Sequence, residues 1–186
     1  MFSPMAMTFS CMISVTVRLE LGYLLAFRAS TSAGFSVATT VFNVSFNTLS
    51  DISPASYCSN IKELNISNNM ISDISSLKAL NNLLTLNFSR NSVVDLPEFN
   101  QDCKIVTIDG SHNMILSLEN LSGLENLNNV YMDYNEELES IEPLLNCPLL
   151  IQVKVYGTKV SDVSGLLEME VIVEFDPTLR MEDDDE

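Results

Sequence analysis

Hydrophobic residues recur along this chain with a period of 22 residues, and an asparagine marks the same place in each period. The asparagines are Asn47, Asn69, Asn91, Asn113 and Asn135. A sixth copy carries Thr158 there, one residue late. The position five residues before these six residues is always apolar: Phe42, Leu64, Leu86, Ile108, Val130 and Val153. A fixed period in this range is typical of a solenoid.

Each period predicts a short strand followed by a turn. Phe42 and Val44 alternate with Asn43 and Ser45, which predicts a strand with one buried face. One unit is too short to bury its apolar side, so we expect the units to stack and their strands to pair in parallel. The asparagine amide both donates and accepts hydrogen bonds, so it can satisfy buried backbone groups where the chain leaves the strand. We therefore expect the stacked asparagines to form a structural ladder.

The repeated pattern apolar-x-x-apolar-x-apolar-x-x-Asn-x-apolar resembles the leucine-rich repeat. The second half of each unit, as in residues 71–77 and 160–166, resembles the short repeats of internalin-type bacterial surface proteins. It is also similar to the repeats of intracellular phosphatase regulators. The resemblance covers about residues 39–175. It implies a right-handed α/β solenoid, with a parallel β-sheet on the concave face and short helical or irregular segments on the convex face.

The repeat divides the chain into three parts. We expect a leucine-rich-repeat domain over residues 36–175, made of six repeats and a C-terminal cap strand at 171–175. Residues 176–186 form an acidic tail that we expect to be disordered. Residues 1–35 lie outside the repeat and have three interpretations: a targeting segment, a cap or truncated repeat, or a mispredicted start. They include no clean apolar run of the length that a membrane span needs.

Two departures from the repeat predict local features. Gly110 occupies a core position of its strand and leaves a hole, and Phe88, one unit earlier on the same line, is large enough to fill it. One residue is inserted within Asn135–Leu138, which predicts a bulged turn at the edge of the sheet. Thr158 can replace asparagine only in part, so we expect the ladder to weaken at the last copy.

Charge and chemistry narrow the function. The chain has 9 basic and 25 acidic residues, a net charge of −16, which argues against nucleic acid and anionic membranes and favours basic partners. Cys58, Cys103 and Cys147 lie on or near the core line of alternate units, too far apart for disulfides, while Cys11 has no assigned place. His112 is the single histidine, and we expect it to be solvated beside Asn113. No His or Cys pair has metal-ligand spacing and no phosphate-binding glycine loop occurs, so we expect neither metal nor cofactor.

The residues between the apolar strand positions face the concave side, where the sequence predicts a binding surface. The first three units offer mostly Asn and Ser there. The last two units supply the candidate ligand-binding residues Tyr131, Asp133, Tyr134, Lys154 and Tyr156. Tyrosine combines apolar area with a hydroxyl and is enriched at interface hot spots. Two alternatives stay open: tyrosine suits exposed strand surfaces in general, and the patch would also suit a missing domain or the N-terminal segment.

These observations favour a non-enzymatic module that binds a protein ligand on its concave sheet. The internalin-like resemblance implies a bacterial cell-surface or secreted setting. The alternative is an intracellular scaffold or phosphatase-regulator-like protein in the cytoplasm, and an enzyme is the remaining class. Solenoid architecture by itself does not decide among them.

Overall fold

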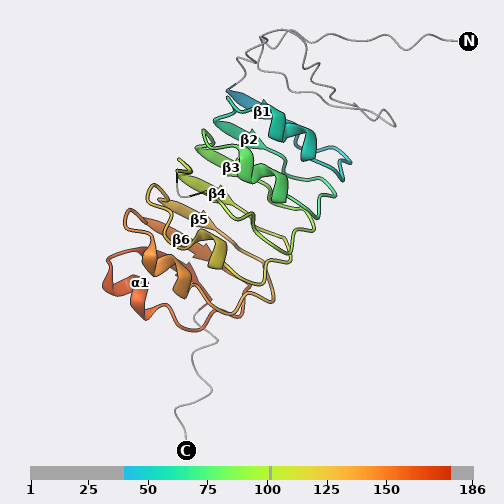
Figure 1. Cartoon of the computed structure of the whole chain (residues 1–186). Coiled ribbons are helices and arrows are strands. Elements are labelled where there is room, and N and C mark those ends of the chain that lie inside the picture. Colours follow the sequence, from blue (N-terminus) through green and yellow to red (C-terminus); the bar gives the residue numbers. More distant parts are fainter. Residues whose placement is uncertain (1–39, 101, 177–186) are drawn as a thin grey trace, which may run out of the picture.

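The computed structural model describes residues 40–100 and 102–176. Each repeat forms one coil of a solenoid, and successive coils are stacked along a common direction (Figure 1). The strands of these coils form one parallel sheet in which sequence neighbours are always sheet neighbours. They are β1 (Val41–Asn43), β2 (Glu63–Asn65), β3 (Thr85–Asn87), β4 (Thr107–Asp109), β5 (Asn129–Tyr131), β6 (Gln152–Val155) and β7 (Ile172–Phe175).

The strands pair in the register that the period of 22 predicts. Phe42 pairs with Leu64, and the same line continues through every strand as Leu86, Ile108, Val130, Val153 and Val173. Leu86, Ile108, Val130 and Val153 are fully buried. This line of apolar residues therefore forms a continuous buried contact between successive coils. The stacked solenoid predicted from the sequence is confirmed.

Short helices occupy the side of the coils away from the sheet (Figure 1). They are the 3-10 helices η1 (Ser53–Tyr57), η2 (Ser75–Ala79), η3 (Glu119–Leu121) and η4 (Glu142–Asn146) and the α-helix α1 (Ser164–Glu168). In the parts that the structure describes between β3 and β4, no helix is formed. Each helix sends one apolar residue into the core; these are Ala55, Leu77, Leu121, Leu144 and Leu166.

A polar residue two positions upstream fixes the start of each helix. The Oδ1 atoms of Asp51 and Asp73 accept the backbone N–H of Ser53 and Ser75 at 2.8 Å, and Asp162, Ser117 and Ser140 play the same part for the other helices. Hydrogen bonds from Ser53 lower the pKa of Asp51, and those from Ser75 lower the pKa of Asp73. The Ser-Asp-apolar-Ser sequence of residues 50–53, 72–75 and 161–164 thus encodes the beginning of a helix.

The asparagines form a ladder of hydrogen bonds between coils. Asn135 is fully buried; its amide nitrogen donates to the carbonyls of Gly110 and Met132, and its Oδ1 accepts the N–H of Ile115. Each such asparagine therefore joins its own strand end to the preceding coil. The other residues that make both of these bonds to the preceding coil are Asn69, Asn91 and Asn113.

The ladder stops at Thr158 for a structural reason. The Thr158 hydroxyl donates to Val155 within its own coil, at 2.8 Å. In the preceding coil, the N–H of Leu138 donates to the carbonyl of Asn135 at 3.0 Å. The inserted residue thus allows a turn over residues 136–137 in which the N–H of Leu138 is bonded within its own coil. In the earlier coils the corresponding N–H donates to the asparagine of the next coil, and here no such asparagine is needed. The insertion lies outside the strands, and Val130 still pairs with Val153.

Cys58, Cys103 and Cys147 are buried, and Cys103 and Cys147 carry free thiols. Burial raises the pKa of the Cys103 and Cys147 thiols, which keeps them protonated. Cys11 lies outside the described residues, as do the expected N-terminal segment and most of the acidic tail. Across residues 40–100 and 102–176, no helix has the length and apolar character needed to cross a membrane.

Candidate functional site

The five candidate ligand-binding residues lie together on two adjacent coils. Tyr131 pairs directly with Lys154 across β5 and β6, and the N–H of Tyr134 donates to the carbonyl of Tyr156 just beyond these strands. Tyr134 and Tyr156 keep 51% and 37% of their surface exposed, so they offer contact area to a partner. We call the surface formed by Tyr131, Asp133, Tyr134, Lys154 and Tyr156 the tyrosine patch.

Asp133 is at the centre of the tyrosine patch. Its Oδ1 accepts the backbone N–H of Tyr156 at 2.8 Å, which links the carboxylate to the next coil. Burial raises the pKa of Asp133, and the carboxylates of Asp109 and Glu174 raise it further. The hydrogen bond from Tyr156 and the charge of Lys154 act in the opposite direction, but the net shift is upward.

Lys154 is held on one side of the patch by the last strand. Its Nζ lies 3.0 Å from Oε1 of Glu174 on β7 and 5.8 Å from the ring centroid of Tyr131. The hydrogen bond to Glu174 is the main cause of the raised pKa of Lys154. Gln152 donates to Glu174 at 2.7 Å and accepts from the hydroxyl of Tyr131 at 3.2 Å. Gln152 and Glu174 therefore fix two patch residues. The sequence did not single out Glu174 because the repeat register fades after Leu167.

A row of planar side chains borders the patch next to the asparagine ladder. The rings of His112 and Tyr134 are stacked, with centroids 4.4 Å apart and an interplanar angle of 11°. Nη2 of Arg90 lies 3.3 Å from Nε2 of His112 on the other side. We call Arg90, His112 and Tyr134 the planar row. His112 keeps part of its surface exposed to solvent, as expected, and its ring also stacks on Tyr134.

The planar row follows from an unusual backbone conformation. The residue before each ladder asparagine is left-handed, with φ between 54° and 57°. These residues are Phe46, Asn68, Arg90, His112 and Tyr134. Non-glycine residues adopt this conformation infrequently, and a strict repeat places it at the same point of every coil. The side chains at this point are therefore neighbours and can stack.

The first four coils present a different surface. The Oδ1 atoms of Asn43, Asn65 and Asn87 accept the N–H of the serine two residues later at 3.0 Å, and Asp109 does the same at 3.1 Å. These side chains are bound to their own strand ends. These four positions are polar, whereas Tyr131 occupies the same row on β5. In the row beside the ladder, Phe46 is 72% exposed on the first coil.

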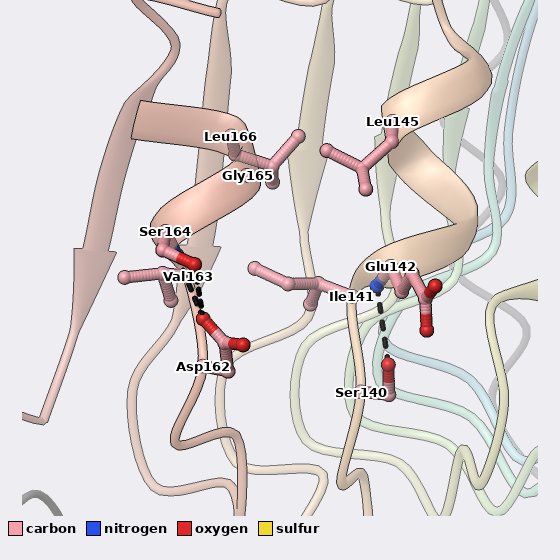
Figure 2. A pocket seen from close by; sticks show the side chains of 9 residues that line it. All are labelled: Ser140, Ile141, Glu142, Leu145, Asp162, Val163, Ser164, Gly165 and Leu166. Atoms are coloured by element: carbon pink, nitrogen blue, oxygen red, sulfur yellow. Dashed lines mark hydrogen bonds between the residues drawn. The ribbon is translucent and has the colours of Figure 1, made fainter. Parts of the chain in front are cut away.

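A groove of about 360 Å³ lies on the opposite side of the molecule, between η4 and α1 (Figure 2). Leu145 of η4 points across it toward Gly165 of α1. The Asp162 carboxylate accepts hydrogen bonds from Ser164 within its own coil, and the Ser140 hydroxyl accepts the N–H of Glu142 in the same way. The groove is therefore a packing seam between two coils. In the described part of the chain, no three His, Cys, Asp or Glu residues converge as a metal site.

Comparisons with known proteins agree with this architecture. The family model described as "Leucine Rich repeats (2 copies)" matches residues 40–79. The open parallel sheet and the continuation of the same register beyond the match settle the class. The fold is a leucine-rich-repeat solenoid. The predicted fold class and the internalin-like character of the repeats are confirmed.

Solved leucine-rich-repeat structures resemble the chain over most of its length. Internalin C2 from Listeria monocytogenes is 26% identical with a TM-score of 0.66, over 72% of this chain and 60% of that one. The internalin inlF from the same organism is 21% identical, with a TM-score of 0.51 over 72% and 46%. The leucine-rich-repeat domain of APL1B is 19% identical, with a TM-score of 0.58 over 74% and 40%.

The chain thus spans 60% or less of the length of these leucine-rich-repeat proteins. A search of curated proteins found no match. The leucine-rich-repeat fold and its internalin neighbours imply a protein-interaction module.

Proposed function

We propose that this leucine-rich-repeat domain recognises a protein ligand through the tyrosine patch on its sheet. The observation that carries the proposal is the concentration of Tyr131, Tyr134 and Tyr156 on two adjacent coils, whereas the first three coils carry mostly Asn and Ser with Phe46 as an exposed aromatic residue. Tyrosine gives large contact area at low conformational cost and dominates many interface hot spots. The hydrogen bonds that hold Tyr131 and Lys154 in place make the surface preorganised.

The proposed setting is a bacterial cell surface or the secreted fraction. The similarity to internalin C2 supports it. Fractionation of cells that express the native gene tests this part, and recovery of the protein only from the cytosol would favour the intracellular scaffold instead.

The proposed binding surface is tested with the intact chain immobilised as bait. Proteins captured by the wild type are measured again against the Tyr131→Ala/Tyr156→Ala variant, and the dissociation constant of the purified ligand is determined for both. We expect the double variant to weaken binding by at least about 2 kcal/mol, because truncated hot-spot tyrosines cost this much.

Tyr57→Ala is the matched control. Tyr57 is 69% exposed at the end of η1, on the side of the coil away from the sheet. We expect it to bind like the wild type. Equal affinity of the double variant and the wild type would show that the ligand binds elsewhere.

A further inference from the structure

The carboxylates in and beside the tyrosine patch outnumber the cation of the patch within the described part of the molecule. Asp109, Asp133 and Glu174 act on one another strongly enough for Asp109 and Glu174 to raise the pKa of Asp133. The cation among them is Lys154, and its ammonium group is bonded to Glu174. Asp176, whose Oδ2 accepts the N–H of Gly157 at 2.6 Å, adds a further carboxylate at the same end of the sheet.

Asp133 is the carboxylate of the tyrosine patch, and it keeps hydrogen-bonding capacity for a ligand. One oxygen accepts the Tyr156 N–H, and within the described residues its other oxygen, Oδ2, has no hydrogen-bond partner. The strand register places Tyr131, Tyr134 and Tyr156 on the positions around it. A half-buried carboxylate beside tyrosines is a favourable place for a cation, because the carboxylate supplies charge and the aromatic faces attract it.

We propose that the tyrosine patch binds a lysine or arginine side chain on an exposed segment of its protein ligand, with the Asp133 carboxylate as the bonding partner. The inference rests on the proposed function, because it names the chemistry of the ligand at the same surface. Lys154 does not fully neutralise Asp109, Asp133 and Glu174. The positive charge of the ligand side chain offsets the repulsion that remains among these carboxylates. The net charge of −16 draws basic ligands toward the molecule during the encounter.

The same charges oppose other occupants. A second copy of this chain would bring another acidic surface, and nucleic acids or acidic peptides would meet like charge at Asp133. A free metal ion would need several converging ligands, and the described residues supply no such cluster. A basic protein segment is the occupant whose charge and size both fit.

The test uses a random peptide library displayed on phage, selected on the full chain. We expect the enriched peptides to be rich in Lys and Arg, and their affinity to fall as ionic strength rises. Affinities of synthetic versions of the enriched peptides are then measured for the wild type and for Asp133→Asn. The asparagine Oδ1 can still accept the Tyr156 N–H, so the substitution removes charge while preserving the bond between coils. We expect Asp133→Asn to weaken binding about tenfold or more.

Glu119→Gln controls for net charge. Glu119 begins η3, away from the sheet, and its removal changes the total charge by the same amount as Asp133→Asn. We expect it to leave peptide affinity unchanged. Equal weakening by Glu119→Gln and Asp133→Asn would overturn the inference, because it would show a general attraction to an acidic protein.

The outcomes separate this inference from the proposed function. Enriched peptides without basic residues that lose binding in Tyr131→Ala/Tyr156→Ala would overturn the inference and leave the proposed function standing. A selection that enriches no basic sequences also overturns the inference. Basic peptides that depend on Asp133 but bind Tyr131→Ala/Tyr156→Ala normally would support the cation site and contradict the role of the tyrosines.

Discussion

The ring of Phe88 occupies the space that a side chain on Gly110 would fill. A Cβ built on Gly110 would lie 2.5 Å from Cζ of Phe88 and 2.9 Å from Sδ of Met132. Phe88 is fully buried and belongs to the preceding coil. The two residues therefore form a large–small pair across the interface between coils, as the sequence predicts.

Gly110→Ala should destabilise the protein by about 1–3 kcal/mol, because the new methyl group overpacks a filled core. The conclusive measurement adds Phe88→Leu to the same chain and follows urea unfolding of both single variants and the double variant. We expect the double variant to be more stable than the sum of the single effects predicts. Strict additivity would show that the two side chains do not share the space.

Asn135→Ala should cost about 3 kcal/mol or more in the free energy of unfolding. It leaves the N–H of Ile115 and the carbonyl of Met132 buried without their partner, while the carbonyl of Gly110 keeps its bond from Asn113. Each group left unpaired costs about 1–3 kcal/mol. Thr158→Ala should cost about 1 kcal/mol, since Thr158 bonds only within its own coil. Similar losses in the two variants would contradict the break in the ladder.

Asp133→Asn should stabilise the protein at neutral pH. The folded-state pKa of Asp133 is raised above its ordinary value, so the folded state binds more protons than the unfolded state between the two pKa values. Stability is therefore lost as pH rises through that window. The advantage of the variant in thermal unfolding should shrink as the pH falls toward the ordinary pKa of the carboxyl.

Asp73→Asn provides a control of opposite sign. Hydrogen bonds from Ser75 lower the pKa of Asp73, so its ionised form contributes stability above the ordinary pKa, and this is lost as pH falls through the lowered value. We expect this variant to be less stable than the wild type at neutral pH and to approach it in acid. The same pH trend in both variants would disprove the assigned shifts.

Gly157→Ala should be more damaging than Gly123→Ala. Both glycines have a left-handed backbone, with φ of +63° and +76°, so each substitution costs about 1–2 kcal/mol in strain. At Gly157 the added Cβ would also lie 2.7 Å from Cδ1 of Tyr134, whereas nothing lies within 4 Å at Gly123. Unfolding in guanidinium chloride gives the loss in free energy of unfolding for each variant. Equal losses would show that Tyr134 does not pack on Gly157.

The stacking of the coils could be predicted from the sequence, whereas the contacts between surface side chains could not. Apolar spacing predicted the pairing of Phe42 with Leu64 and of each later pair, because a buried line repeats at a fixed step. The stacking of His112 on Tyr134 had no such signal, since left-handed backbone at non-glycine residues is not encoded by one residue type. The Lys154–Glu174 bond was missed because a shortened last unit shifts the spacing before β7.

The turn over residues 136–137 has a mechanical consequence. Between earlier coils, the strands and a bridging asparagine must both separate for the coils to part. The coil of β6 has no such asparagine and is joined to the one before it by strand pairing, by packing and by bonds such as those of Tyr156 to Asp133 and of Lys159 to Leu138. The final segment can therefore leave while the asparagines of the remaining coils stay bonded. When the protein is pulled from its C-terminal side, we expect the chain beyond Leu138 to unfold first. The first extension step should therefore have the length of that segment, and the remaining coils should unfold later.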